Sequence, residues 1–125
     1  MTDSLFDIAT RIGVPVARRH IFLCAEQTKP KCCDLERGVA AWEFLKRRLT
    51  ELGLANQGGI LRSKTNCLRI CEGGPIAVVY PEGAWYGQCD PPVLEQIIQD
   101  HLVNGRIVGE FLITEHALKR LEDTI

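Results

Sequence analysis

The sequence contains no apolar run that approaches the roughly 18 consecutive residues of a membrane-spanning helix. It also lacks an excess of charge of one sign, because 15 basic residues are balanced by 16 acidic ones. Nucleic-acid-binding proteins usually concentrate basic residues on one face, so the balance argues against that class. Asp3 and Asp7 lie in the first residues and no apolar stretch follows them, which predicts that there is no signal peptide. We therefore expect a soluble, cytoplasmic protein that binds neither nucleic acid nor membrane.

Two patterns of cysteine chemistry are also missing. There is no Cys-x-x-Cys pair, which a thiol–disulfide oxidoreductase carries on its first strand-to-helix turn. The three histidines, His20, His101 and His116, do not accompany cysteine pairs as the ligands of a Rieske centre do. Six cysteines are nevertheless present in 125 residues, of which 46% are apolar. Such a chain can bury one core without disulfides, and clustered cysteines in a reducing compartment indicate metal ligands.

The first half of the chain predicts an extension, then a strand, a helix and a second strand. Residues 1–19 form an N-terminal extension with apolar residues at helical spacing. Residues 20–24 are rich in strand formers and end at Cys24. Asp34 is placed to cap a helix that stops near Gly53. The apolar stripe of this helix is Leu35, Val39, Trp42, Leu45, Leu49 and Leu52. A weaker strand pattern follows at residues 60–64.

The second half predicts a hairpin and a second helix. Residues 76–80 are an unbroken apolar run, and a Pro-Glu-Gly turn leads from them to residues 85–88. Asp90 and Pro91 predict the start of a helix, whose apolar stripe is Leu94, Ile97, Ile98 and Leu102. The order of elements is typical of a single-domain α/β protein with a thioredoxin-like fold. We expect a mixed sheet with helices on both faces, because the apolar run needs cover on both sides.

Five cysteines fall into two groups that one sheet can bring together. They are Cys24, Cys32, Cys33, Cys67 and Cys71. Four thiolates around one centre fit either a structural zinc ion or a [2Fe–2S] cluster, and the three residues between Cys67 and Cys71 are compatible with both. Cys89 stands apart, and we interpret it as a packing residue.

Several stretches resemble the thioredoxin-like [2Fe–2S] ferredoxin family. They begin with His20–Cys24 and the Cys-x-x-x-Cys pair at 67 and 71, and the most specific is the run from Gly74 to Gly83 with Trp85-Tyr86-Gly87 behind it. The match continues through 91–94 and 110–113, so it covers roughly residues 20–113. Those residues are expected to be the ferredoxin domain, with 114–125 as a C-terminal tail.

The resemblance implies a one-electron carrier, not an enzyme, that holds a single [2Fe–2S] cluster. Its implied ligands are Cys24, Cys33, Cys67 and Cys71, with Cys32 as the alternative to Cys33. It further implies a homodimer and redox partner proteins. The alternative function is a zinc-stabilised or thiol-based redox-sensing binding module that uses the same cysteines.

Two finer expectations concern the surroundings of the cysteines. Thioredoxin-like folds commonly have a cis-proline before the central strand, so the Gly74–Pro75 bond is expected to be cis. Basic residues flank the cysteine loops and predict a rim that steers an acidic redox partner: Lys29, Lys31, Arg62, Lys64 and Arg69.

Overall fold

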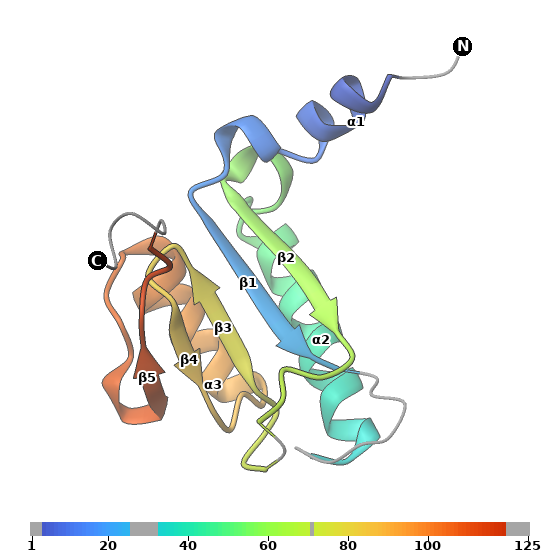
Figure 1. The fold of residues 1–125 in the computed structure, drawn as a ribbon. Coiled ribbons are helices and arrows are strands. Elements are labelled where there is room, and N and C mark those ends of the chain that lie inside the picture. Colours follow the sequence, from blue (N-terminus) through green and yellow to red (C-terminus); the bar gives the residue numbers. More distant parts are fainter. Residues whose placement is uncertain (1–3, 26–32, 71, 120–125) are drawn as a thin grey trace.

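The computed structural model describes residues 4–25, 33–70 and 72–119, and Figure 1 shows how they are arranged. Its helices are α1 (Leu5–Arg11), α2 (Leu35–Glu51) and α3 (Pro91–Gln96), and its strands are β1 (Arg19–Cys24), β2 (Ile60–Thr65), β3 (Ala77–Tyr80), β4 (Ala84–Tyr86) and β5 (Leu112–Glu115). The helix of α3 continues as the π-helical segment η3 (Ile97–Val103), and the short 3-10 helices are η1 (Val14–Val16), η2 (Asn56–Gly58) and η4 (Gly109–Phe111).

The strands form one mixed sheet in the order β2-β1-β3-β4-β5. β1 and β2 are parallel, since α2 crosses over between them, and every other pair is antiparallel. The predicted strands and hairpin are confirmed. β5 is a finding of the structure, because the tail pattern is too short to predict a strand.

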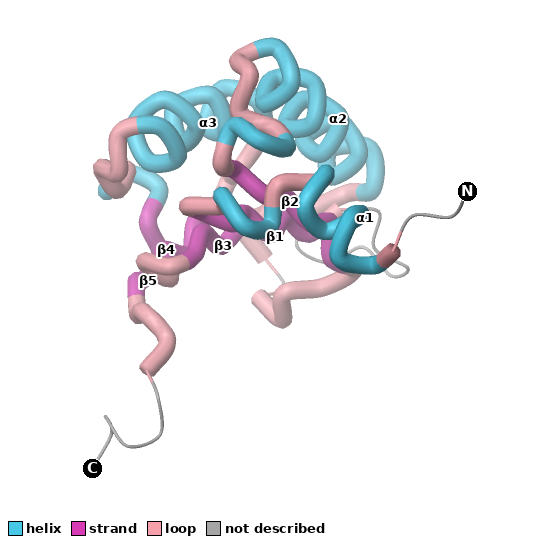
Figure 2. Tube along the Cα trace, turned by 90° about the horizontal axis from the view of Figure 1, so that it is seen from above, coloured by secondary structure: helices cyan, strands magenta, loops and turns pink. Residues whose placement is uncertain are grey.

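The two long helices, α2 and the continuous helix formed by α3 and η3, pack on the same face of the sheet (Figure 2). Ile21 and Leu23 of β1 share one buried cluster with Leu45 of α2, and also with Leu94 and Ile98 of the continuous helix formed by α3 and η3. The mixed sheet and thioredoxin-like class are confirmed, but the prediction of helices on both faces is wrong for the described residues.

The second face of the apolar strand β3 is covered by its own neighbours in the sheet. Val78 is only 2% exposed, and its cross-strand partners are Phe22 on β1 and Trp85 on β4. Partners in register point to the same side of a sheet. Two large aromatic side chains therefore shield Val78 without a second layer of helices.

The beginning and end of α2 follow the sequence prediction. The Asp34 side chain caps the helix by accepting a hydrogen bond from Arg37 N at 2.8 Å. Gly53, just after the helix, has a φ of 70°, a conformation that glycine adopts readily. Trp42, Leu45 and Leu49 of the predicted stripe are buried.

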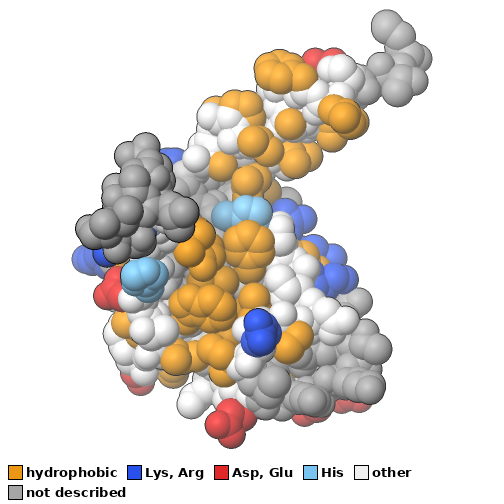
Figure 3. Space-filling view, in the orientation of Figure 1, with side chains coloured by type: hydrophobic (Ala, Val, Ile, Leu, Met, Phe, Trp, Pro, Cys, Tyr) orange, Lys and Arg blue, Asp and Glu red, His pale blue; other side chains and the backbone are white. Residues whose placement is uncertain are grey.

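The N-terminal extension contains α1, which projects beyond the end of the sheet (Figures 1 and 3). A capping box between Ser4 and Asp7 starts this helix, and none of its residues is buried. Gln57 anchors its end by donating a side-chain hydrogen bond to Thr10 O at 2.7 Å. No helix in the described ranges is long and apolar enough to cross a membrane.

Candidate metal centre

The described cysteines of the predicted site lie at one end of the sheet. Cys24 ends β1 and is 1% exposed, Cys33 lies just before α2 and is half-buried, and Cys67 is exposed in the loop after β2. β1 and β2 run parallel, and Cys24 is paired with Thr65, two residues before Cys67. The cysteine-bearing ends of both strands therefore meet at the same edge. Cys32 and Cys71 lie outside the described residues.

A small apolar cluster surrounds these positions and is separate from the main core. Cys24 and Ile76 are its buried centre. Its partly buried members are Cys33, Leu68, Ile70 and Trp85. The structure therefore brings Cys33, from the start of α2, against the same apolar group as Cys24. The loop that holds Cys67 contributes Leu68 and Ile70 to that group.

Two cysteine sulfurs accept hydrogen bonds from backbone amides. Ile76 N donates to Cys24 Sγ, and Arg69 N donates to Cys67 Sγ, each at 3.1 Å. Arg69 has a φ of 72°, a left-handed conformation that turns its amide back toward Cys67. Hydrogen bonds from N–H groups favour the thiolate form of cysteine. Thiolates are the ligands of both zinc and iron–sulfur clusters, so these two residues fit such a group chemically.

The side chain of Arg37 connects three segments around the cysteines. It forms a two-pronged ion pair with Asp90 at 2.7 and 3.2 Å and donates to Gly74 O at 2.9 Å. Hydrogen bonding to Asp90, together with the charge of that carboxylate, raises the pKa of Arg37. Gly74 precedes Pro75 through a cis peptide bond, as predicted. The start of α2, the start of α3 and the segment that leads to Ile76 are thus held together by one guanidinium group.

The described side chains do not by themselves complete a metal site. Among residues 4–25, 33–70 and 72–119, no three His, Cys, Asp or Glu side chains converge to hold a metal ion. Cys89 is buried and its thiol donates to Gly87 O at 3.6 Å. Burial raises the pKa of Cys89 and keeps its thiol neutral, which fits the predicted packing role.

The basic residues around the cysteine loops do not form one uniform set. Arg62 is half-buried, and its guanidinium lies 5.9 Å from the centre of the Trp42 ring on α2. Lys64 and Arg69 are exposed. Lys29 and Lys31 lie outside the described residues. Arg62 therefore packs against the helix layer, which weakens the predicted basic rim.

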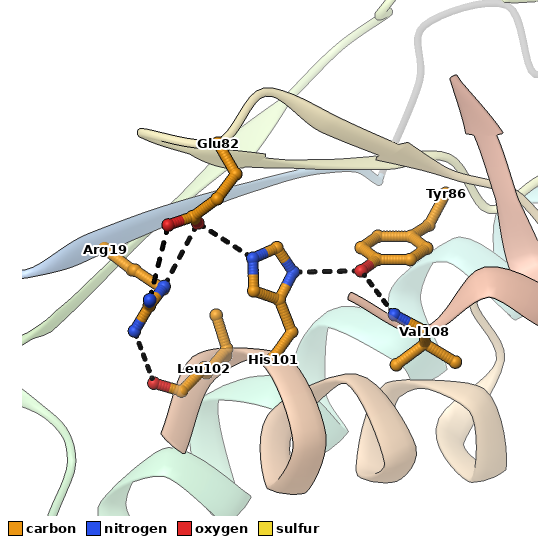
Figure 4. A network of polar contacts seen from close by, with 6 residues as sticks. All are labelled: Arg19, Glu82, Tyr86, His101, Leu102 and Val108. Carbon is orange, nitrogen blue, oxygen red and sulfur yellow. Dashed lines mark hydrogen bonds and ion pairs between the residues drawn. The ribbon is translucent and has the colours of Figure 1, made fainter. Parts of the chain in front are cut away.

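Sequence reasoning missed a polar network on the helix side of the sheet, which is buried at His101 and Tyr86 and partly exposed at Arg19 and Glu82 (Figure 4). His101 Nε2 lies 2.8 Å from Glu82 Oε1, and His101 Nδ1 lies 2.9 Å from Tyr86 Oη. Arg19 holds the same carboxylate with Nε and Nη2, and Val108 N donates to Tyr86 Oη at 3.0 Å. The sequence does contain a sign that His101 is buried, because His101 follows Ile97 and Ile98 at helical spacing and so falls on the apolar stripe of this helix.

The Tyr86 hydroxyl and the His101 ring connect the parts of this network. Tyr86 Oη accepts a hydrogen bond from the Val108 amide and shares a second one with His101 Nδ1. On the other side of the ring, His101 Nε2 shares a hydrogen bond with Glu82 Oε1. The network thus joins β1, the hairpin turn, the η3 end of the helix formed by α3 and η3, and the segment before β5.

A thioredoxin-like domain with cysteine thiols gathered at one edge of its sheet is the class that fold and site define. No protein-family model matches the chain. The chain is 33% identical over 100 residues to the 2Fe-2S ferredoxin of Clostridium pasteurianum, a match that covers 77% of this chain and 96% of the relative. It is 29% identical over 102 residues to the 2Fe-2S ferredoxin of Aquifex aeolicus (strain VF5), across 78% of this chain and 90% of the relative.

Comparison with solved structures agrees with the sequence relatives. The structure of the thioredoxin-like [2Fe–2S] ferredoxin from Aquifex aeolicus is similar with a TM-score of 0.68 and 25% identity, covering 82% of this chain and 96% of that one. The chain belongs to the thioredoxin-like [2Fe–2S] ferredoxin family.

Proposed function

We propose that this protein is a one-electron carrier that binds a single [2Fe–2S] cluster through Cys24, Cys33, Cys67 and Cys71. The 33% identity to a 2Fe-2S ferredoxin over most of the chain is the observation that carries the proposal. When bound, the cluster supplies a centre that accepts and releases one electron. Its exchange with redox partner proteins is the whole function, and the chain itself catalyses no substrate chemistry.

The residues of the site prepare it for negative charge. Amides of Ile76 and Arg69 donate hydrogen bonds to two of the sulfurs, and hydrogen bonds to sulfur are one of the factors that set the potential of an iron–sulfur cluster. Leu68, Ile70 and Trp85 pack around buried Cys24 and keep water from that side. Cys67 is exposed, so one edge of the site is open to the surface. A partner protein can approach this edge closely, which shortens the path of the electron.

Cys33 is proposed as the fourth ligand for two reasons. It packs against the apolar cluster around Cys24. It also lies directly before Asp34, the N-cap of the 17-residue helix α2. The dipole of a helix favours a thiolate at this end. Cys32 is the alternative.

The composition of the purified protein tests this function. We expect anaerobically prepared protein to be red-brown, to contain iron and acid-labile sulfide in equal amounts, and to bleach with dithionite. The competing zinc-stabilised module predicts colourless protein that contains zinc alone. A thiol-based sensor predicts colourless, metal-free protein whose cysteines oxidise reversibly. Either result would overturn the ferredoxin proposal.

We further propose a homodimer. Hydrophobic side chains gather on the face of the sheet that α2 and α3 leave open (Figure 3). Among them, Phe22 stacks on His20 and makes an edge contact with Tyr80. An uncovered aromatic group of this kind is typical of an interface. Sedimentation velocity checks the proposal: the wild type should sediment as a dimer and Tyr80→Glu as a monomer, whereas a monomeric wild type contradicts it.

The division of the chain and its compartment are also proposals. Residues 20–113 are taken as the ferredoxin domain, with 1–19 as an extension and 114–125 as a tail. Support comes from α1, which buries no residue, and from the exposure of 116–119, although β5 continues to Glu115. We propose the cytoplasm as the compartment, because thiolate ligands must stay reduced until the cluster is assembled.

A further inference from the structure

A groove of about 570 Å³ lies beside the loop that holds Cys67 and Cys71. Ile70 and Glu72 line it from the cysteine loop, and Glu110, Phe111, Leu112 and Ile113 line it from the C-terminal segment. Ile70 immediately precedes Cys71 in the chain. Whatever enters the groove therefore lies against the loop that also carries Cys67.

Backbone hydrogen bonds hold both walls of the groove. Gln88 N donates to Gly73 O at 2.7 Å, and Gly87 N donates to Phe111 O at 3.1 Å. Neighbouring residues after β4 thus bind the cysteine loop on one side and the C-terminal segment on the other. Gly87 packs closely against the cysteine loop, since a Cβ there would lie 3.2 Å from Gly73 O. The groove is therefore part of the folded domain and needs no rearrangement to form.

The chemistry of the lining is apolar with charge of one sign. The charged groups that line the groove among the described residues are the carboxylates of Glu72 and Glu110. Both residues are exposed, and within the described part of the chain neither carboxylate forms an ion pair or hydrogen bond. Phe111, Leu112 and Ile113 form the apolar part, and Ile113 is 48% exposed. Lysine and arginine match such a surface, because their apolar stems pack while their charged ends reach the carboxylates.

We propose that this groove is the docking site for a lysine or arginine side chain on the basic face of a redox partner protein. The proposal rests on the proposed electron-carrier function and names the chemistry of its partner. Opposite charges steer the two proteins together, and the apolar floor holds the stem of the inserted side chain. The carboxylates of Glu72 and Glu110 thus orient a basic partner next to the Cys67–Cys71 loop.

The test uses cluster-loaded protein with cytochrome c as a basic probe and flavodoxin as an acidic one. Stopped-flow measurements follow the oxidation of the reduced protein by cytochrome c, and calorimetry measures binding when both proteins are oxidised. We expect E72Q and E110Q each to weaken binding and slow transfer between about two- and fivefold at low ionic strength, and the double variant to combine both losses. The differences should vanish at high salt.

Glu43→Gln is the matched control, since Glu43 is an exposed carboxylate on α2 that pairs with Lys46. It should leave both measurements unchanged. Because Glu72 adjoins Cys71, E110Q carries the test alone if E72Q loses its cluster. Wild-type rates and affinities in E110Q, or tighter binding of flavodoxin than of cytochrome c, would overturn the proposal. A protein without the visible cluster spectrum would instead overturn the ferredoxin function itself.

Discussion

Arg37 at the start of α2 and Asp90 at the start of α3 form a two-pronged ion pair, with Nη2 2.7 Å from Oδ2 and Nε 3.2 Å from Oδ1. The two residues are 53 positions apart in the chain. Asp90 occupies the N-cap position of α3 but makes no side-chain capping bond, so its carboxylate is committed to Arg37. The same guanidinium binds Gly74 O, and through that bond the contact between two helices reaches the cysteine site.

Replacing Arg37 should loosen the cluster. Arg37→Met removes the bond to Gly74 O, and the segment that carries the Ile76 amide to Cys24 Sγ loses its support. Residues that support metal ligands typically contribute about tenfold or more to metal retention. We expect roughly tenfold faster release of iron to a chelator and a lower reduction potential. Arg37→Lys should restore only part of the effect, because lysine cannot form the two-pronged pair.

Arg48 provides a matched control for this prediction. Arg48 forms the same kind of pair with Glu95, at 2.8 and 3.2 Å, between the same two helices. Arg48 lies in the last turn of α2, at the opposite end of that helix from Arg37 and Cys33. Arg48→Met should therefore lower thermal stability slightly and leave the potential unchanged. Equal shifts in potential for both variants would mean that Arg37 acts only by joining the helices.

Single serine substitutions should identify the fourth ligand. Cys33→Ser is expected to reduce cluster content and change the visible spectrum, since serine oxygen is a poorer ligand for iron than thiolate sulfur. Cys32→Ser should retain iron and sulfide at the wild-type level. The measurement is iron and acid-labile sulfide per protein in each variant. The reverse result would assign the site to Cys32.

Tyr86→Phe should destabilise the fold without touching the cluster. The substitution removes the acceptor of the Val108 amide and the hydrogen-bond partner of His101 Nδ1, and both of these bonds are buried. Leaving buried polar groups unpaired costs about 1–3 kcal/mol. Denaturant unfolding measures the loss, and the reduction potential should not change. Tyr80→Phe is the control, because the Tyr80 hydroxyl makes no hydrogen bond within the described residues; a similar loss there would contradict the role of the network.

The contribution of Glu82 to stability should depend on pH. Burial opposes its ionisation, but hydrogen bonds from Arg19 and His101 outweigh burial and lower the pKa of Glu82 below the ordinary 4.5. A carboxylate with a lowered pKa in the folded state stabilises the fold fully above its unfolded pKa, and this stability is lost as the pH falls through the folded value. The free-energy difference between wild type and Glu82→Gln should therefore be largest near neutral pH and shrink below about pH 4.5. A free-energy difference between the two proteins that stays constant with pH would contradict this role of Glu82.

Local patterns predicted the elements because they depend on residues close together in the chain. Asp34 caps α2 through a bond to Arg37 N, three residues away. The Pro-Glu-Gly turn joins β3 to β4. The apolar spacing of residues 94–102 marks the buried side of the helix formed by α3 and η3. The position of Cys24 at the end of a strand follows from the same kind of pattern.

The sequence by itself thus determined the fold family, the order of elements and the set of cysteines from which the ligands come. Only the tertiary structure decided that both helices share one face, that Arg37 reaches Gly74, and that the Ile76 amide binds a sulfur 52 residues away. It also decided that His101 is a buried partner of Tyr86 and Glu82. The physical reason is that these contacts join segments far apart in the chain, so no local pattern of residues specifies them.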